Sequence, residues 1–134
     1  MAFKFSLNSS SGVPYYRQIV NQVTYGVVNS IFEPGERLPT VRQLAVDLQV
    51  NLNTVSKAYT ELELKGIVNT QQGTGTFISE NKVRIDPKTK EKGLRQLCLN
   101  FLNETAALGI KAEDSLKELK KIESERKRNP HKGN

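Results

Sequence analysis

The 134-residue sequence contains one cysteine, one histidine and no tryptophan. Cys98 cannot form an internal disulfide, and a single histidine gives no Cys/His cluster of the kind that holds zinc. No apolar run approaches the roughly 20 residues that span a bilayer, and residues 1–12 lack the apolar stretch of a signal peptide. We therefore expect a cytoplasmic protein with no bound metal and no membrane segment.

Residues that could carry catalysis are also scarce. The chain has no Ser/His/Asp or Cys/His set and no phosphate-binding loop. His131 lies near the C-terminal end, where we expect it to be inert. Cys98 occupies an apolar position, where we expect a small core residue rather than a redox switch. The sequence therefore predicts no catalytic residue and no cofactor.

The net charge of +6 is distributed unevenly along the chain. Residues 1–79 have six Lys/Arg against five Asp/Glu, whereas residues 80–134 have fourteen against nine. Total charge is thus weak support for nucleic-acid binding by the first part of the chain. The local positions of its basic residues matter more, namely Arg17, Arg37, Arg42, Lys57 and Lys65.

Residues 40–66 have the pattern of two short helices joined by a tight turn. Thr40 can cap the first helix, and Gln43 completes a Thr-x-x-Gln capping box. Asn51 or Asn53 can cap the second helix, and Gly66 can end it. Apolar residues recur at helical spacing in both. They are Val41, Leu44, Ala45 and Leu48 in the first helix and Val55, Ala58, Tyr59 and Leu62 in the second.

The opposite face of the second helix is polar and consists of Asn53, Ser56, Lys57 and Thr60. Amide, hydroxyl and ammonium groups suit contacts with base edges and phosphates. Two predicted strands, 67–70 and 76–79, follow around a hairpin tip in which Gly73 and Gly75 permit positive φ. This order predicts a winged helix-turn-helix, which places one helix in the major groove of DNA.

The N-terminal part supports this unit. Phe3, Phe5 and Leu7 alternate with polar residues and predict a short strand or an extended arm. Residues 13–32 predict a helix whose apolar stripe packs against the helix-turn-helix. The stripe consists of Tyr16, Ile19, Val20, Val23, Val27 and Ile31.

The C-terminal part is helical by pattern after a charged linker at residues 80–92, which has room for the start of a helix. One helix ends at Gly109, and a second runs from Lys111 to about Lys127. Two helices of this size cannot bury their apolar faces alone, so we expect residues 93–128 to form a dimerisation domain. Its contacts are predicted at Leu94, Leu97, Phe101, Leu116 and Leu119. Residues 129–134 are predicted to be a disordered tail.

A series of short motifs lies between Pro34 and Phe77. The motifs are Pro34-Gly35, Leu38-Pro39, Val41-Arg42-Gln43-Leu44-Ala45, Asn53-Thr54-Val55, Lys57-Ala58-Tyr59, Glu61-Leu62-Glu63, Gly66 and Gly73-Thr74-Gly75-Thr76-Phe77. In these motifs the segment resembles the DNA-binding domain of GntR-type bacterial transcription regulators, and the resemblance extends over residues 1–79. The short remainder resembles the YtrA-type branch. The resemblance implies a mainly α protein with a small β wing, in which a winged helix-turn-helix precedes a two-helix dimerisation domain.

The resemblance also implies a homodimer that binds double-stranded DNA at a pseudo-palindromic operator. We expect a repressor rather than an activator, because the chain has no evident segment for recruiting polymerase and can simply obstruct it. The residues expected to contact DNA are Arg42, Asn51, Asn53, Thr54, Ser56, Lys57, Gln72, Gly73 and Thr74. The alternative for Arg42 and for the polar helix face is an ordinary solvated surface. A small-molecule effector is compatible with this class, and no residue identifies one.

Two places depart from the family pattern. Many relatives have arginine near Leu52, where it can bind guanine with two hydrogen bonds, and basic residues near Gln71 and Gln72, where they neutralise phosphates. An alternative function is a winged-helix module that binds protein through the same helix face, and a steep salt dependence would favour DNA instead. RNA binding is disfavoured because the sequence offers no aromatic residues for stacking on an exposed sheet.

Overall fold

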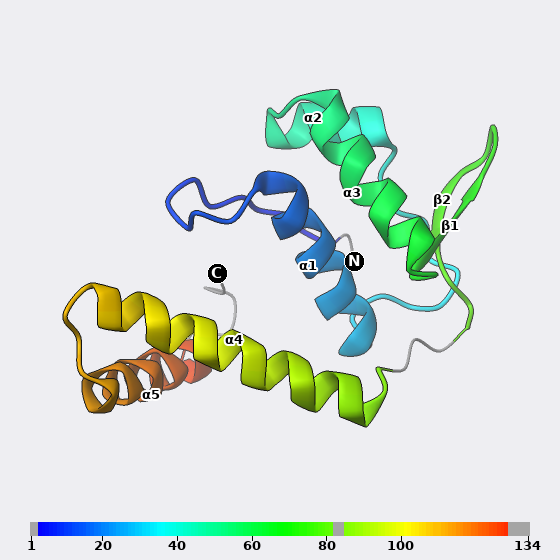
Figure 1. Ribbon diagram of the computed structural model, residues 1–134. Helices are drawn as coiled ribbons and strands as arrows, with labels where there is room; N and C mark the ends of the chain where they lie inside the picture. Colours follow the sequence, from blue (N-terminus) through cyan, green and yellow to red (C-terminus); the bar gives the residue numbers. More distant parts are fainter. Residues whose placement is uncertain (1–2, 82–84, 129–134) are drawn as a thin grey trace. The chain divides into compact units, whose positions relative to one another are not determined.

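The computed structural model describes residues 3–81 and 85–128, which contain five α-helices and one two-stranded sheet. The chain divides into two units between residues 84 and 85. The first contains α1 (Tyr15–Val28), α2 (Val41–Leu48), α3 (Leu52–Leu64), β1 (Val68–Gln71) and β2 (Gly75–Ile78), and the second contains α4 (Pro87–Ala107) and α5 (Ala112–Arg128) (Figure 1). The predicted fold class, mainly α with a small β wing, is confirmed.

Local capping signals set the boundaries of α2 and α3. The Gln43 N–H donates a hydrogen bond to the Thr40 side chain at 3.0 Å. The Asn53 N–H donates to the Asn51 side chain at 2.8 Å, so Asn51 rather than Asn53 is the N-cap of α3. Gln49 ends α2 in the left-handed region, at φ 56°. The chain therefore turns sharply between the two helices and starts α3 at once.

The core of the first unit forms where α3 packs against α1 and α2 (Figure 1). The buried residues of these helices are Ile19, Val20 and Val23 of α1, Leu44 and Ala45 of α2, and Val55, Ala58, Tyr59 and Leu62 of α3. The apolar face predicted for α3 is therefore confirmed in full. Because this face is fixed against two helices, the opposite face of α3 is held toward solvent.

The helix α1 is shorter than the predicted span of residues 13–32. It ends at Val28, and Ser30 then adopts a left-handed conformation at φ 58°. The Phe32 ring folds back over Gly26, where an added Cβ would lie 2.6 Å from the ring. Phe32 is buried as a result, whereas Ile31, predicted as part of the apolar stripe, is exposed. The turn therefore decides which of the two apolar residues enters the core.

The strands β1 and β2 form an antiparallel hairpin that projects from the helices (Figure 1). In its register Val68 pairs with Ile78 and Gln71 with Gly75, so each strand is displaced by one residue from its predicted position. Gly73, at φ 80°, lies in the tip. This hairpin is the predicted wing.

Residues 3–8 form an extended arm rather than a strand. Phe5 is buried, and the rings of Phe3 and Phe32 lie 4.6 Å apart between centroids. The Gln22 side chain donates to the Ser6 carbonyl at 2.7 Å and accepts from the Ser6 N–H at 3.0 Å. The arm is thus tied to α1 by both apolar and polar contacts.

In the second unit, α4 and α5 contact each other across a turn at Gly109, which has φ 79°. The helix α4 begins inside the predicted linker because Asp86 caps it and Pro87 suits its first position. Ser115 is the one buried residue among positions 85–128. The exposed apolar residues include Leu94, Leu97, Leu108, Leu116, Leu119 and Ile122, while Phe101 and Leu102 are half-buried.

Cys98 is exposed on α4, so the prediction of a core position is wrong for the single chain. A pair of helices has no third layer, and an apolar position on its surface therefore stays open to solvent. The predicted tail, with His131, lies outside the described residues.

Candidate nucleic-acid interface

The outer face of α3 is the first part of the candidate site. Asn53, Ser56, Lys57 and Thr60 are all exposed there, one or two helical turns from one another. They line a shallow hollow together with Glu61 and Leu64. A helix that is apolar behind and polar in front presents hydrogen-bonding groups on a rigid support.

The other residues predicted to contact DNA from the helices differ in accessibility. Arg42 is exposed in the first turn of α2. Asn51 is exposed, and its side-chain oxygen accepts the Asn53 N–H, which leaves its amide N–H groups and one lone pair of that oxygen for a ligand. Thr54 is half-buried and presents less surface than its neighbours. Leu52 is exposed at the first position of α3.

Lys57 contacts an aromatic ring of α1 that the sequence did not mark as part of the site. Its ammonium nitrogen lies 4.0 Å from the centroid of the Tyr16 ring. The Arg17 guanidinium lies 5.2 Å from the same centroid. Contacts of this kind are attractive because the face of the ring is negative. Tyr16 therefore helps to position Lys57 on the exposed face of α3.

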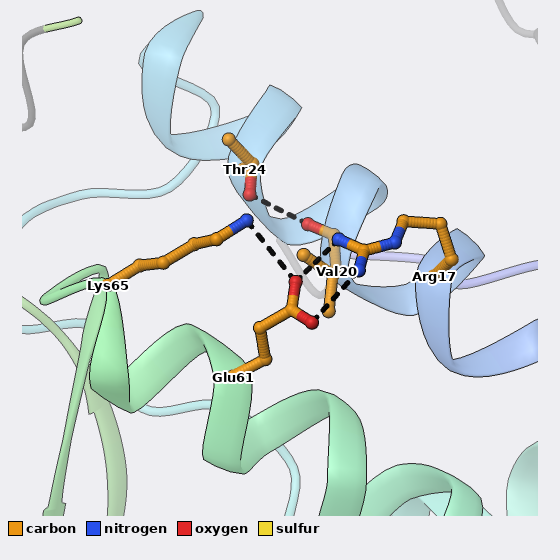
Figure 2. Close-up of polar contacts among 5 residues, drawn as sticks. All are labelled: Arg17, Val20, Thr24, Glu61 and Lys65. Atoms are coloured by element: carbon orange, nitrogen blue, oxygen red, sulfur yellow. Dashed lines mark hydrogen bonds and ion pairs between the residues drawn. The ribbon is translucent and has the colours of Figure 1, made fainter.

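An ion-pair cluster centred on Glu61, which also lines this hollow, joins α1 to α3. The Arg17 guanidinium donates two hydrogen bonds to the Glu61 carboxylate, one of them at 2.9 Å, and the Lys65 ammonium lies 3.2 Å from a Glu61 oxygen (Figure 2). The hydrogen bond from Arg17 holds the pKa of Glu61 below its usual value, and Glu61 in turn raises the pKa of Arg17. Arg17 and Lys65 are thus engaged within the protein, whereas Arg42 and Lys57 are paired with no carboxylate among the described residues.

The wing tip is the second part of the candidate site. Gln71, Gln72, Gly73 and Thr74 are exposed. The Thr74 N–H donates to the Gln71 carbonyl at 3.0 Å and closes the turn. The tip has hydrogen-bonding side chains and accessible backbone but no basic residue of its own.

Tyr59 supports the site from behind, and its replacement by phenylalanine should reduce stability without changing the exposed face. Its hydroxyl donates to the Pro39 carbonyl at 2.6 Å, which fixes the chain just before α2. Loss of this hydrogen bond should lower the free energy of unfolding by about 0.5–1.5 kcal/mol at neutral pH.

The difference in the free energy of unfolding between the parent chain and Tyr59→Phe should also depend on pH. Burial raises the pKa of Tyr59, so the phenol ionises first in the unfolded state, at pH ~10. Its contribution is present below that pH and is lost as the pH rises further. Denaturant titrations at pH 7 and 11 should therefore show a smaller difference in the free energy of unfolding between the two proteins at pH 11. An equal gap at both values would contradict this account.

Comparison with known proteins agrees with the geometry. The model of the "Bacterial regulatory proteins, gntR family" matches residues 15–78, which run from the start of α1 to the end of β2. A transcriptional repressor of Bacillus subtilis, YtrA, is 35% identical over 119 residues, which cover 89% of this chain and 92% of YtrA. The chain belongs to the GntR family. It is accordingly a DNA-binding transcription regulator, in a family of regulators rather than enzymes.

Two further similarities extend across most of the chain. The uncharacterised regulator YhcF of Bacillus subtilis is 39% identical over 110 residues, which cover 82% of this chain and 90% of YhcF. A solved GntR regulator from Listeria monocytogenes is 38% identical, with a TM-score of 0.57, and the match covers 84% of this chain and 97% of that one.

No helix among the described residues is both long and apolar enough to cross a membrane.

Proposed function

We propose that this GntR regulator is a homodimeric repressor that binds a pseudo-palindromic operator. The observation that carries the proposal is the exposed polar face of α3, formed by Asn53, Ser56, Lys57 and Thr60 on a helix whose other face is buried. A helix fixed in this way can enter a major groove and present its side chains to base edges. The name of the similar protein YtrA, a repressor, favours repression over activation. Such a regulator acts in the cytoplasm, where bacterial DNA is found.

The proposed contacts divide between base edges and backbone. Asn53 from the first turn of α3 and Lys57 from the next turn reach base edges, with Asn51, Thr54 and Ser56 beside them. Arg42, at the start of α2, contacts a phosphate flanking the groove. Gln72, Gly73 and Thr74 approach the neighbouring backbone from the wing, where amide groups donate without charge.

Dimerisation through the second unit follows from its uncovered apolar residues. Leu94 and Leu97 of α4 are 64% and 68% exposed, and Leu116 and Leu119 of α5 are 56% and 45% exposed. Apolar surface of this extent seldom stays in water on a small protein. Pairing two chains, with Phe101 beside the leucines, would bury both stripes in a four-helix arrangement.

Alanine replacements on α3 test the contact with DNA. Asn53→Ala and Lys57→Ala should each weaken binding to an operator selected from a random duplex library by the full chain. Loss of a bidentate base contact should cost about 1–3 kcal/mol and relax the preference at one base pair. Loss of a phosphate contact should instead weaken all sequences alike. Thermal unfolding should be nearly unchanged, since both side chains are exposed.

Asn21→Ala is a matched control because Asn21 is an exposed asparagine on α1 and is not among the residues proposed to contact DNA. It should leave affinity and preference unchanged. Parental affinity in both α3 variants would contradict the assignment of this face. If the full chain binds duplex DNA with no sequence preference and little dependence on salt, the proposal that it recognises an operator is contradicted, and a protein partner is favoured.

A further inference from the structure

Arg37 lies beside the wing in a position that the sequence does not indicate. It belongs to the segment before α2, far along the chain from the hairpin, yet its backbone forms an antiparallel bridge with Phe77. On either side of this bridge, the Leu38 N–H donates to the Thr76 carbonyl at 2.8 Å and the Ile78 N–H donates to the Glu36 carbonyl at 2.8 Å. The segment thus pairs along the edge of β2 and extends the two-stranded sheet by one short antiparallel pairing.

The register of these pairs places the Arg37 side chain on the outer face of the wing. Residues alternate between faces along a strand, and Leu38, Thr76 and Ile78 are buried on the inner face. Arg37, Phe77 and Gly75 therefore share the outer face, and Gln71 joins them as the cross-strand partner of Gly75. The guanidinium is consequently directed along the same face as the exposed glutamine near the tip.

Gly75 makes room for this side chain. A Cβ at position 75 would lie 2.9 Å from the Arg37 Nε and 3.3 Å from one of its terminal nitrogens. Contacts below about 3.0 Å force a displacement, so any larger residue would push the guanidinium away. The absence of a side chain at position 75 therefore lets the Arg37 guanidinium lie close to the hairpin backbone near its tip.

The charge of Arg37 is uncompensated among residues 3–81 and 85–128. No ion pair to it occurs there, and the side chain is exposed. The neighbouring Glu36 carboxylate accepts the Glu33 N–H at 3.0 Å, within its own loop. Arg37 differs in this respect from Arg17 and Lys65, whose charges are engaged by Glu61.

We infer that Arg37 is the phosphate-binding residue of the wing. The tip itself, residues 71–75, has no basic side chain, and an arginine lying on its outer face supplies the missing charge. A guanidinium binds a phosphate through two parallel N–H donors, a geometry that an exposed arginine on the outer face of the wing can present to the DNA backbone. This inference rests on the proposed binding of operator DNA, and it assigns one contact of that interface.

The test compares Arg37→Gln, Arg37→Lys and the parent full chain on two probes. One is the duplex selected from a random library by the parent, and the other is a duplex of scrambled sequence. Affinity is measured between 50 and 200 mM salt. One lost phosphate contact should reduce the slope of log affinity against log salt by about 0.9, so Arg37→Gln should lose about 3.5-fold less affinity than the parent over this range. The reduction should be the same on both probes, because phosphates carry no sequence information.

Two controls separate this contact from a general effect of charge and from the function itself. Lys121→Gln removes one positive charge from α5 and should leave the salt slope of the parent unchanged. Arg37→Lys retains the charge at position 37 and should also keep the parental slope. If the parent selects a sequence but Arg37→Gln has the same salt slope as the parent, the role of Arg37 is overturned and the proposed function stands. A parent chain that selects no sequence and binds without salt dependence would instead overturn the proposed function. Equal thermal unfolding of all variants would show that folding does not cause the difference.

Discussion

Leu62→Ala is expected to lower the free energy of unfolding by about 2–5 kcal/mol. The side chain is fully buried where α3 meets the rest of the core, so its loss removes apolar contacts and leaves a cavity. A domain of this size has a total stability of about 5–15 kcal/mol, which makes a loss of this size a large part of the total. DNA binding should then fall only in proportion to the unfolded fraction.

Leu64→Ala is the matched control, because it removes the same atoms from the same helix. Leu64 is 84% exposed, so its replacement should change the free energy of unfolding by no more than about 0.5 kcal/mol. Denaturant titrations of both variants, combined with DNA binding at a temperature where each is folded, make the comparison. Similar losses of stability at positions 62 and 64, or loss of binding by folded Leu62→Ala, would mean that α3 is rotated about its axis relative to this account.

The arrangement of α2 and α3 could be predicted from the sequence because each local signal agreed with the others. Thr40 and Asn51 cap the helices with their own side chains, and the apolar spacing of α3 matches the buried set. Such features depend on residues two to four positions apart, so no tertiary information is needed to find them. The exposed polar face of α3 follows from the same spacing.

Contacts between distant segments could not be predicted in this way. Arg17 and Glu61 are 44 positions apart, and the pairing of Tyr16 with Lys57 depends on how α1 crosses α3. The bridge between Arg37 and Phe77 likewise requires the loop before α2 to reach the wing. Composition marks these residues as basic or aromatic, but only packing decides that Arg17 is engaged by Glu61 and that Arg37 is not.

Removal of the second unit is expected to have the largest effect on DNA affinity. A chain ending at Asn81 retains the whole core around α3, because every buried apolar residue among the described positions lies between Phe5 and Ile78. It should therefore stay folded, but it should be monomeric and bind a full operator about 10²–10⁴-fold more weakly, because a second tethered domain engages at high effective concentration. Its affinity for a half-site should change little. Sedimentation and titrations on half-site and full-site duplexes measure these quantities.

Point variants of the full chain distinguish loss of the dimer from loss of the helices themselves. Leu97→Asp with Leu116→Asp places two carboxylates on the exposed apolar stripes and should reproduce the monomer and its weak full-site binding. Lys121→Asp alters charge on the side of α5 away from Leu116 and Leu119 and should remain dimeric. Helix content should be similar in both, because most residues of α4 and α5 are exposed and lose little packing. A monomeric parent chain, or full-site affinity undiminished in the chain ending at Asn81, would remove dimerisation from the mechanism and leave the exposed leucines of α4 and α5 to another partner.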